Sequence, residues 1–130
     1  MADVEQVWNR ACSTHPGTGP GDRHLRALLD VHGMLMNGGV DHAVDVNTVE
    51  QFAQAADACE YLSLPEVAAL LRRMPDYDRT DEAEAELNSA YGSRADDEVL
   101  CAALKRRWEQ APGDFAPLAP GTTSDAAFDP

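Results

Sequence analysis

The sequence predicts an all-α fold. Apolar residues recur at spacings of three to four along most of the chain, which places them on one face of a helix. Between these segments the chain carries helix-start residues followed three positions later by an acid, and Gly or Pro residues that end helices. Residues 40–46 alternate as a strand does, but a lone strand would have no partner, so we expect a turn or a short helix there.

The first two helices are expected at residues 3–13 and from Asp22 onward. An aspartate suits a helix start because its side chain can accept a hydrogen bond from a free backbone N–H. Gly38 and Gly39 should end the second helix, since glycine readily adopts the left-handed angles found there. The apolar faces comprise Val4, Val7, Trp8, Ala11 and Cys12 in the first helix, and Leu25, Leu28, Leu29, His32 and Met36 in the second.

The third and fourth helices are each preceded by a residue pair typical of a capping box. Asn47 with Glu50 would begin the third, and Ser63 with Glu66 the fourth. Pro65 lies just inside the fourth helix, where its missing N–H has no cost. The apolar faces comprise Val49, Phe52, Ala53, Ala56 and Cys59 in the third helix, and Val67, Leu70, Leu71 and Met74 in the fourth.

The fifth helix is expected to begin at Asp81 with Glu84, and the sixth near Asp96 or Asp97. The sixth should end at about residue 110. The apolar faces comprise Ala83, Leu87, Ala90 and Tyr91 in the fifth helix, and Leu100, Ala103, Leu104 and Trp108 in the sixth.

A segment rich in Pro, Gly and small residues follows the sixth helix. Phe115 and Leu118 could pack its first part onto the helices. The remainder lacks the apolar residues needed for a core. We therefore expect a single helical domain over residues 1–118 and a flexible, disordered tail over residues 119–130.

The charge of the chain restricts its partners. The formal net charge is −13, from 23 acids and 10 bases, so nucleic acid and anionic membrane surfaces would be repelled. A basic protein is the expected partner, although acidity can also serve solubility alone. The start of the chain has no basic, apolar leader, which favours the cytoplasm.

Residues that could support chemistry are few. His42 lies between Asp41 and Asp45, with His32 ten positions earlier, and such groups can bind zinc or iron. The spacing is not that of ligand pairs on a helix, and His32 fits a hydrogen-bonded position in the core. The three cysteines, Cys12, Cys59 and Cys101, are expected to be buried free thiols. We therefore expect no bound metal, no cofactor and no enzymatic activity.

Acidic residues are concentrated between positions 76 and 98. Several lie in the first turns of predicted helices, where the helix dipole favours them without any functional role. Asp76, Asp78 and Glu86 do not fit that explanation, and the apolar face of the fifth helix should direct its acids outward. The candidate partner-binding residues are Asp76, Asp78, Asp81, Glu82, Glu84, Glu86, Asp96, Asp97 and Glu98.

Two parts of the chain together resemble the bacterial DNA-mimic protein domain family. In the first part, Asn37, Gly38 and Gly39 match the family's Asn-Gly-Gly turn, in the stretch MNGGVDHAVDVNTVEQFAQAADACEYLSLPEVAALLRR. The second part is DEAEAELNSAYGSRADDEVLCAALKRRWEQAPGDF, and the resemblance covers roughly residues 24–116. His42 stands where the family has a glutamine, and Val40 where it has an aromatic residue.

The resemblance implies an all-helical domain whose carboxylates stand in for DNA phosphates on a DNA-binding regulator. It also implies a structural turn at Asn37, Gly38 and Gly39, in which we expect one glycine to have a positive φ. Our first hypothesis is a non-enzymatic acidic protein-interaction module of this kind, which could also form a homodimer. The alternatives are an immunity or antitoxin-like protein that neutralises a basic toxin, and a metal-dependent enzyme using His42.

Overall fold

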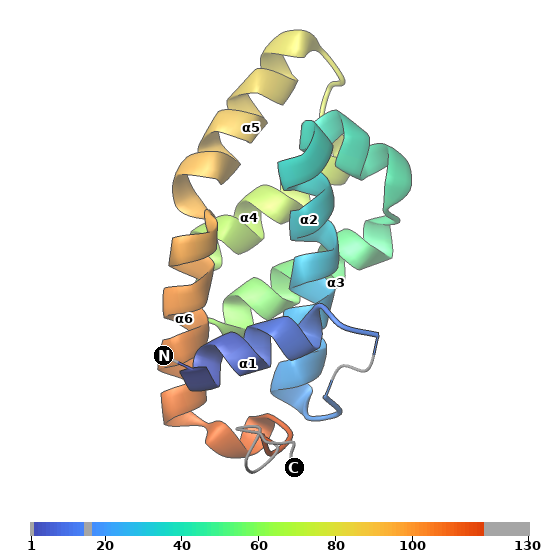
Figure 1. The fold of residues 1–130 in the computed structure, drawn as a ribbon. Helices are drawn as coiled ribbons and strands as arrows, with labels where there is room; N and C mark the ends of the chain where they lie inside the picture. Colours follow the sequence, from blue (N-terminus) through green and yellow to red (C-terminus); the bar gives the residue numbers. More distant parts are fainter. Residues whose placement is uncertain (1, 15–16, 119–130) are drawn as a thin grey trace.

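The structure, a computed structural model, describes residues 2–14 and 17–118 (Figure 1). In these ranges it contains helices and no strand, so the all-α prediction is confirmed. The predicted flexible tail, residues 119–130, lies outside the described residues. The elements are α1 (Ala2–Ala11), α2 (Pro20–Val46), α3 (Val49–Tyr61), α4 (Pro65–Arg73), η1 (Met74–Asp76), α5 (Asp81–Arg94), α6 (Asp97–Gln110) and η2 (Pro112–Asp114), where η marks a short 3-10 helix.

The long helix α2 organises the arrangement. It contacts α1, α3 and α5, while α4 packs between α3 and α5. Helices α5 and α6 follow one another along one side of the molecule, and α1 crosses the lower half of α2 to reach α6 (Figure 1). Among the described residues, no helix combines the length and the apolar character needed to cross a bilayer.

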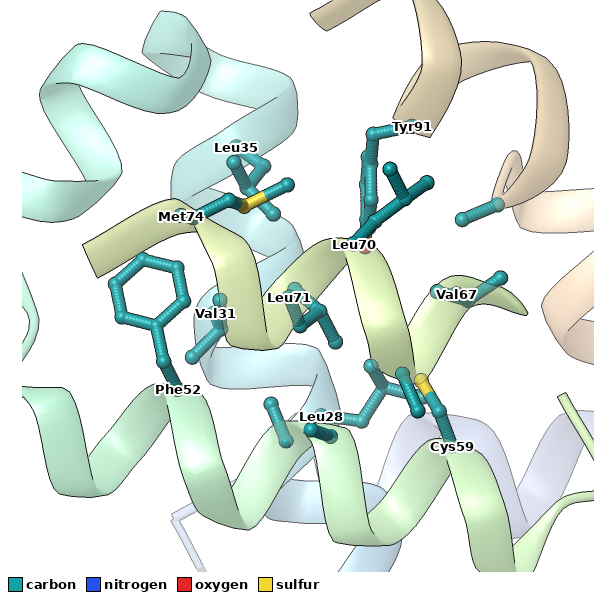
Figure 2. Packing of buried hydrophobic residues seen from close by; sticks show 14 of the residues in the cluster. Leu28, Val31, Leu35, Phe52, Cys59, Val67, Leu70, Leu71, Met74 and Tyr91 are labelled. Atoms are coloured by element: carbon teal, nitrogen blue, oxygen red, sulfur yellow. The ribbon is translucent and has the colours of Figure 1, made fainter. Parts of the chain in front are cut away.

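The main core lies between α2, α3 and α4. Figure 2 shows side chains from four elements directed into one shared space. They are Leu28 and Val31 of α2, Phe52 of α3, Leu71 of α4 and Met74 of η1. Each of these side chains is almost fully buried. Burying one large apolar side chain contributes about 1.5–3 kcal/mol, so this face of α2 holds the three helices together.

A second, smaller core joins the two ends of the described chain. It contains Val4 and Val7 of α1, Leu104 of α6 and Phe115 beyond η2, with Leu118 packed against them. The predicted packing of Phe115 and Leu118 is therefore confirmed.

Asp22 ties this second core together from the start of α2. Its carboxylate is 1% exposed and pairs with Arg10 Nη2 at 2.8 Å. It also accepts hydrogen bonds from the backbone N–H of Gly19 at 3.1 Å and of Ala116 at 2.7 Å. Asp22 thus does bond the start of α2, as predicted, but it lies inside the helix, which begins earlier, at Pro20.

Two helix starts are displaced by one residue from the predicted positions. Thr48, not Asn47, caps α3, with its Oγ1 accepting from Gln51 N at 3.1 Å. Thr80, not Asp81, caps α5. In both places cap-forming residues adjoin each other, and the register is decided by which face of the helix must be buried. Asn47 instead donates to the carbonyl of Ala43 at the end of α2.

Other details of the predicted pattern were wrong. The expected Ser63–Glu66 capping box does not begin α4, whose N-cap is Leu64 with no side-chain hydrogen bond. Met36, Val49 and Ala53 were placed on apolar faces but are exposed. Met36 lies within α2 with 55% of its surface exposed, and the α3 face rotates so that Ala55 and Ala58 are buried instead.

Candidate protein-interaction surface

The Asn-Gly-Gly stretch forms a sharp kink within α2. Gly39 has φ 84° and ψ −176°, and the chain then resumes a short helical segment over residues 40–46. A helix that restarts has free N–H groups, and α5 supplies their acceptors. Asn88 Oδ1 accepts from Val40 N at 2.9 Å, and Glu84 Oε2 accepts from Asp41 N at 3.0 Å.

Gly38 has a different role from Gly39. A Cβ atom built at Gly38 would lie 2.6 Å from the His42 ring, so the glycine leaves the space that this ring occupies. His42 therefore packs against the turn. In the described part of the chain, the side chains that accept hydrogen bonds from the backbone at the kink, Asn88 and Glu84, come from α5.

The segment from the last residue of η1 to the start of α5 is attached to the short segment of α2. We call residues 76–80 the acidic loop. Arg79 bridges two carboxylates of α2, with Nε 2.8 Å from Asp41 Oδ1 and Nη2 2.8 Å from Asp45 Oδ1. The Tyr77 hydroxyl donates to Asp41 Oδ1 at 2.6 Å. This hydrogen bond, with the nearby Arg79 guanidinium, lowers the pKa of Asp41, while partial burial and the carboxylate raise the pKa of Tyr77 to about 12.

These contacts bear on the metal hypothesis. The two carboxylates that flank His42 are both bound to Arg79. His32 is 5% exposed and donates from Nε2 to the Asp97 carboxylate at 2.8 Å, while Nδ1 lies 2.7 Å from the Tyr91 hydroxyl oxygen. Across the described residues, no group of three or more His, Cys, Asp or Glu side chains is placed to hold a metal ion.

The cysteines differ in burial from the prediction. Cys59 is buried, but Cys12, which follows the last residue of α1, is exposed, and Cys101 is half-buried. Burial raises the pKa of Cys59 to about 12 and also raises the pKa of Cys12 and of Cys101. Nucleophilic catalysis needs a thiolate, and these environments disfavour one.

Three of the candidate partner-binding acids have structural contacts of their own. Glu84 caps the short segment of α2, as described above. Asp96 caps α6 by accepting from Val99 N at 2.9 Å. Asp97 bonds to buried His32 but keeps 73% of its side chain exposed. The remaining candidates are all exposed: Asp76, Asp78, Asp81, Glu82, Glu86 and Glu98.

The structure brings some of these exposed acids together around one hollow. It has a volume of about 400 Å³ and lies between the end of α4, the acidic loop and α5. Asp76 and Asp78 of the acidic loop and Glu86 of α5 line it, together with the buried Leu87. The sequence signal was the clustering of acids that no helix start explains.

Two arginines at the end of α4 line the same hollow, and sequence reasoning did not place them there. Arg72 is already paired with Asp57 at 2.8 Å and with Glu60 at 2.6 Å on α3. Arg73 is exposed beside the carboxylates. The two residues directly precede η1, so the signal that could have found them is a basic pair a few residues before the acidic loop.

The candidate acids do not form one continuous patch. Asp81 and Glu82 begin α5, near the acidic loop, whereas Asp96, Asp97 and Glu98 lie at the start of α6 (Figure 1). Helix α5 separates these two groups, and its 14 residues span about 21 Å at 1.5 Å per residue. The surface is therefore one group around the hollow and a second at the α5–α6 junction.

Comparison with known proteins assigns the family. Residues 19–122 match the family model described as DMP19-like protein, which covers most of the chain. The chain belongs to the DMP19-like protein family. No match was found among curated proteins or among solved structures. For this DMP19-like protein, the family match includes the kink at Gly39, the acidic loop and both groups of acids.

Proposed function

We propose that this DMP19-like protein is a non-enzymatic protein-interaction module that binds a basic protein through its acidic surface. The partner we favour is a DNA-binding regulator, whose DNA site the carboxylates would occupy in place of phosphates. The observation that carries the proposal is the convergence of Asp76, Asp78 and Glu86 around one hollow, on a chain with a net charge of −13.

The physical basis is charge complementarity. A DNA-binding protein carries arginines and lysines that neutralise phosphates, and DNA presents about one negative charge per 1.7 Å of helix axis. Exposed carboxylates lie at both ends of α5. The negative charge of the protein therefore extends along this side of the molecule. Attraction of this type steers association and is screened by salt over about 8–10 Å.

The interaction is tested by reversing charges around the hollow and at the adjacent start of α5. In one variant Asp78, Glu82 and Glu86 are each replaced by lysine. In a matched control, Glu5, Glu50 and Glu109 are replaced by lysine, because these acids are exposed on α1, α3 and α6. Both variants change the net charge by the same amount, so a general effect of charge would affect them equally.

Partners are recovered from the native host with the wild-type protein and with both variants. Under the proposal, the wild type and the control variant both retain a basic DNA-binding protein, and the hollow variant does not. The wild type also releases this partner from its DNA. A partner that is a basic toxin would instead support the immunity-protein alternative. Equal retention by both variants, or insensitivity to salt, would contradict the acidic-surface proposal.

A further inference from the structure

We infer that Arg79 is a positioning residue for the acidic surface, and that partner binding depends on where Arg79 holds the carboxylates as well as on their charge. The inference rests on the proposed function and adds a residue of opposite charge to it. It predicts that removing a positive charge from this surface weakens the binding of a basic partner.

Arg79 makes several contacts from one exposed position. Its guanidinium reaches Asp41 and Asp45, each at 2.8 Å, and lies 5.5 Å from the centre of the Tyr77 ring. Tyr77 bonds to the same Asp41 oxygen that Arg79 reaches. The acidic loop is thereby attached to the short segment of α2 at two carboxylates, one helical turn apart.

The backbone of Arg79 is also in an unusual conformation. Arg79 has φ 63°, in the left-handed region that residues with a side chain rarely adopt. A residue held there without glycine must be stabilised by its surroundings. The fork of the guanidinium provides this by binding two carboxylates at once, which a lysine could not do with the same geometry.

Both sides of the hollow depend on the same segment of α2. Asp76 and Asp78 flank Tyr77, which is tied with Arg79 to residues 40–46. Glu86 lies on α5, which is tied to the start of that segment through Glu84 and Asn88. Residues 40–46 therefore hold both the acidic loop and α5, which carry the carboxylates of the hollow. Arg79 makes the attachment on the side of the acidic loop.

Charge and position make opposite predictions for one substitution. Arg79→Gln removes a cation and leaves Asp41 and Asp45 without it, so the surface becomes more negative. If charge alone mattered, a basic partner would bind the variant more tightly. If position matters, it would bind more weakly, because the carboxylates around the hollow would no longer be held in place.

Arg94 provides a matched control. It lies at the end of α5, is half exposed, and is 3.6 Å from Glu66 in a looser pair. Arg94→Gln makes the same change in net charge without loosening the acidic loop. A third variant, Arg79→Lys, keeps the charge but loses the guanidinium fork.

The probe is a synthetic alanine-based helical peptide with arginines three and four positions apart along one face, like the face that a recognition helix presents to DNA. Its binding to the full chain is followed by fluorescence anisotropy at low salt. We expect Arg79→Gln and Arg79→Lys to bind at least about threefold more weakly than the wild type. Arg94→Gln should bind as tightly as the wild type or more tightly.

Backbone amide hydrogen exchange provides the second measurement. It should rise at residues 41–45 and 78–80 in both Arg79 variants, with the core amides of α3 unchanged. If Arg79→Gln binds as tightly as Arg94→Gln, or if its exchange is unchanged, the inference is wrong while the proposed function can still hold. If the wild type does not bind the peptide, the proposed acidic-surface function fails, and the exchange measurement alone then decides whether Arg79 holds the loop.

Discussion

Glu84 accepts a hydrogen bond from the backbone N–H of Asp41 across 3.0 Å, although both residues are acids in a chain of net charge −13. The bond is made by a backbone donor, so the carboxylate acts as a helix cap provided by a different helix. Glu84 belongs to the acidic stretch of residues 76–98, yet this bond gives it a structural role. An acid in that stretch is therefore not a binding residue by position alone. Structural roles of this kind can be tested separately from partner binding.

The first prediction concerns Glu84 itself. Glu84→Ala should lower the free energy of unfolding by about 0.5–2 kcal/mol, as the loss of a helix cap does. Glu84→Gln should cost less, because an amide oxygen can still accept from Asp41 N. Urea unfolding monitored by circular dichroism measures both. Glu82→Ala is the control on the same helix, and an equal effect there would show that Glu84 has no capping role.

The second prediction concerns the kink. Gly39→Val should destabilise the fold by more than about 1 kcal/mol, because a side chain at φ 84° incurs the left-handed penalty. Gly92 on α5 is the opposite case, since a Cβ atom there meets no other group within 4 Å. Gly92→Ala should stabilise the protein by about 0.5–1 kcal/mol. Thermal unfolding of the two variants should therefore move in opposite directions.

The third prediction concerns the buried pair of Asp22 and Arg10. Asp22→Ala should cost about 3–5 kcal/mol, because it removes the carboxylate that pairs with the Arg10 charge and accepts from the Ala116 N–H. The exposed pair of Arg26 and Asp30 supplies the comparison, since Asp30→Ala should change stability by about 0–1 kcal/mol. Similar urea midpoints for the two variants would contradict the structural role of Asp22.

The fourth prediction is a dependence of stability on pH through His24. Burial lowers the pKa of His24 below its ordinary value of 6.5, and the ring stacks on Tyr61 at 4.5 Å. Below 6.5 the unfolded chain therefore binds a proton more readily than the folded chain does, so stability falls as the pH drops from 6.5 toward the lowered pKa. His24→Gln should reduce this fall. The decisive measurement is the change in urea midpoint between pH 7.5 and pH 5 in the wild type and in the variant.

The helical fold could be predicted because the apolar period is a local signal that recurs in most of the helices, although α5 buries only Leu87 and Tyr91. The exact helix starts were harder to predict. Asn47 and Thr48 can both form a cap, and only tertiary packing selects one. The partners of the Gly39 kink were beyond sequence reasoning for a different reason. Asn88 lies 48 residues from Val40, and no local pattern indicates such a pairing.

The candidate surface was predicted in part. The excess of acids at Asp76, Asp78 and Glu86 indicated residues without a helix-start role, and the structure places these three around one hollow. The predicted helix boundaries already put Asp96 and Asp97 beyond the far end of α5, but the sequence did not indicate how these acids lie relative to the hollow. Nor did it reveal that Arg79 holds Asp41 and Asp45, since those residues come from a distant segment.

The link between Arg10, Asp22 and Ala116 has a consequence for the order of folding. Arg10 and Ala116 are separated by 106 positions, so their contact can form only after most of the chain has been brought together. The contacts of α3 with α2 and α4 connect neighbouring elements and should form earlier. Substitutions at Arg10 or Asp22 should therefore accelerate unfolding and leave the refolding rate almost unchanged. The contacts of Arg10 and Asp22 therefore slow the unfolding of the native protein and have little effect on how fast it folds.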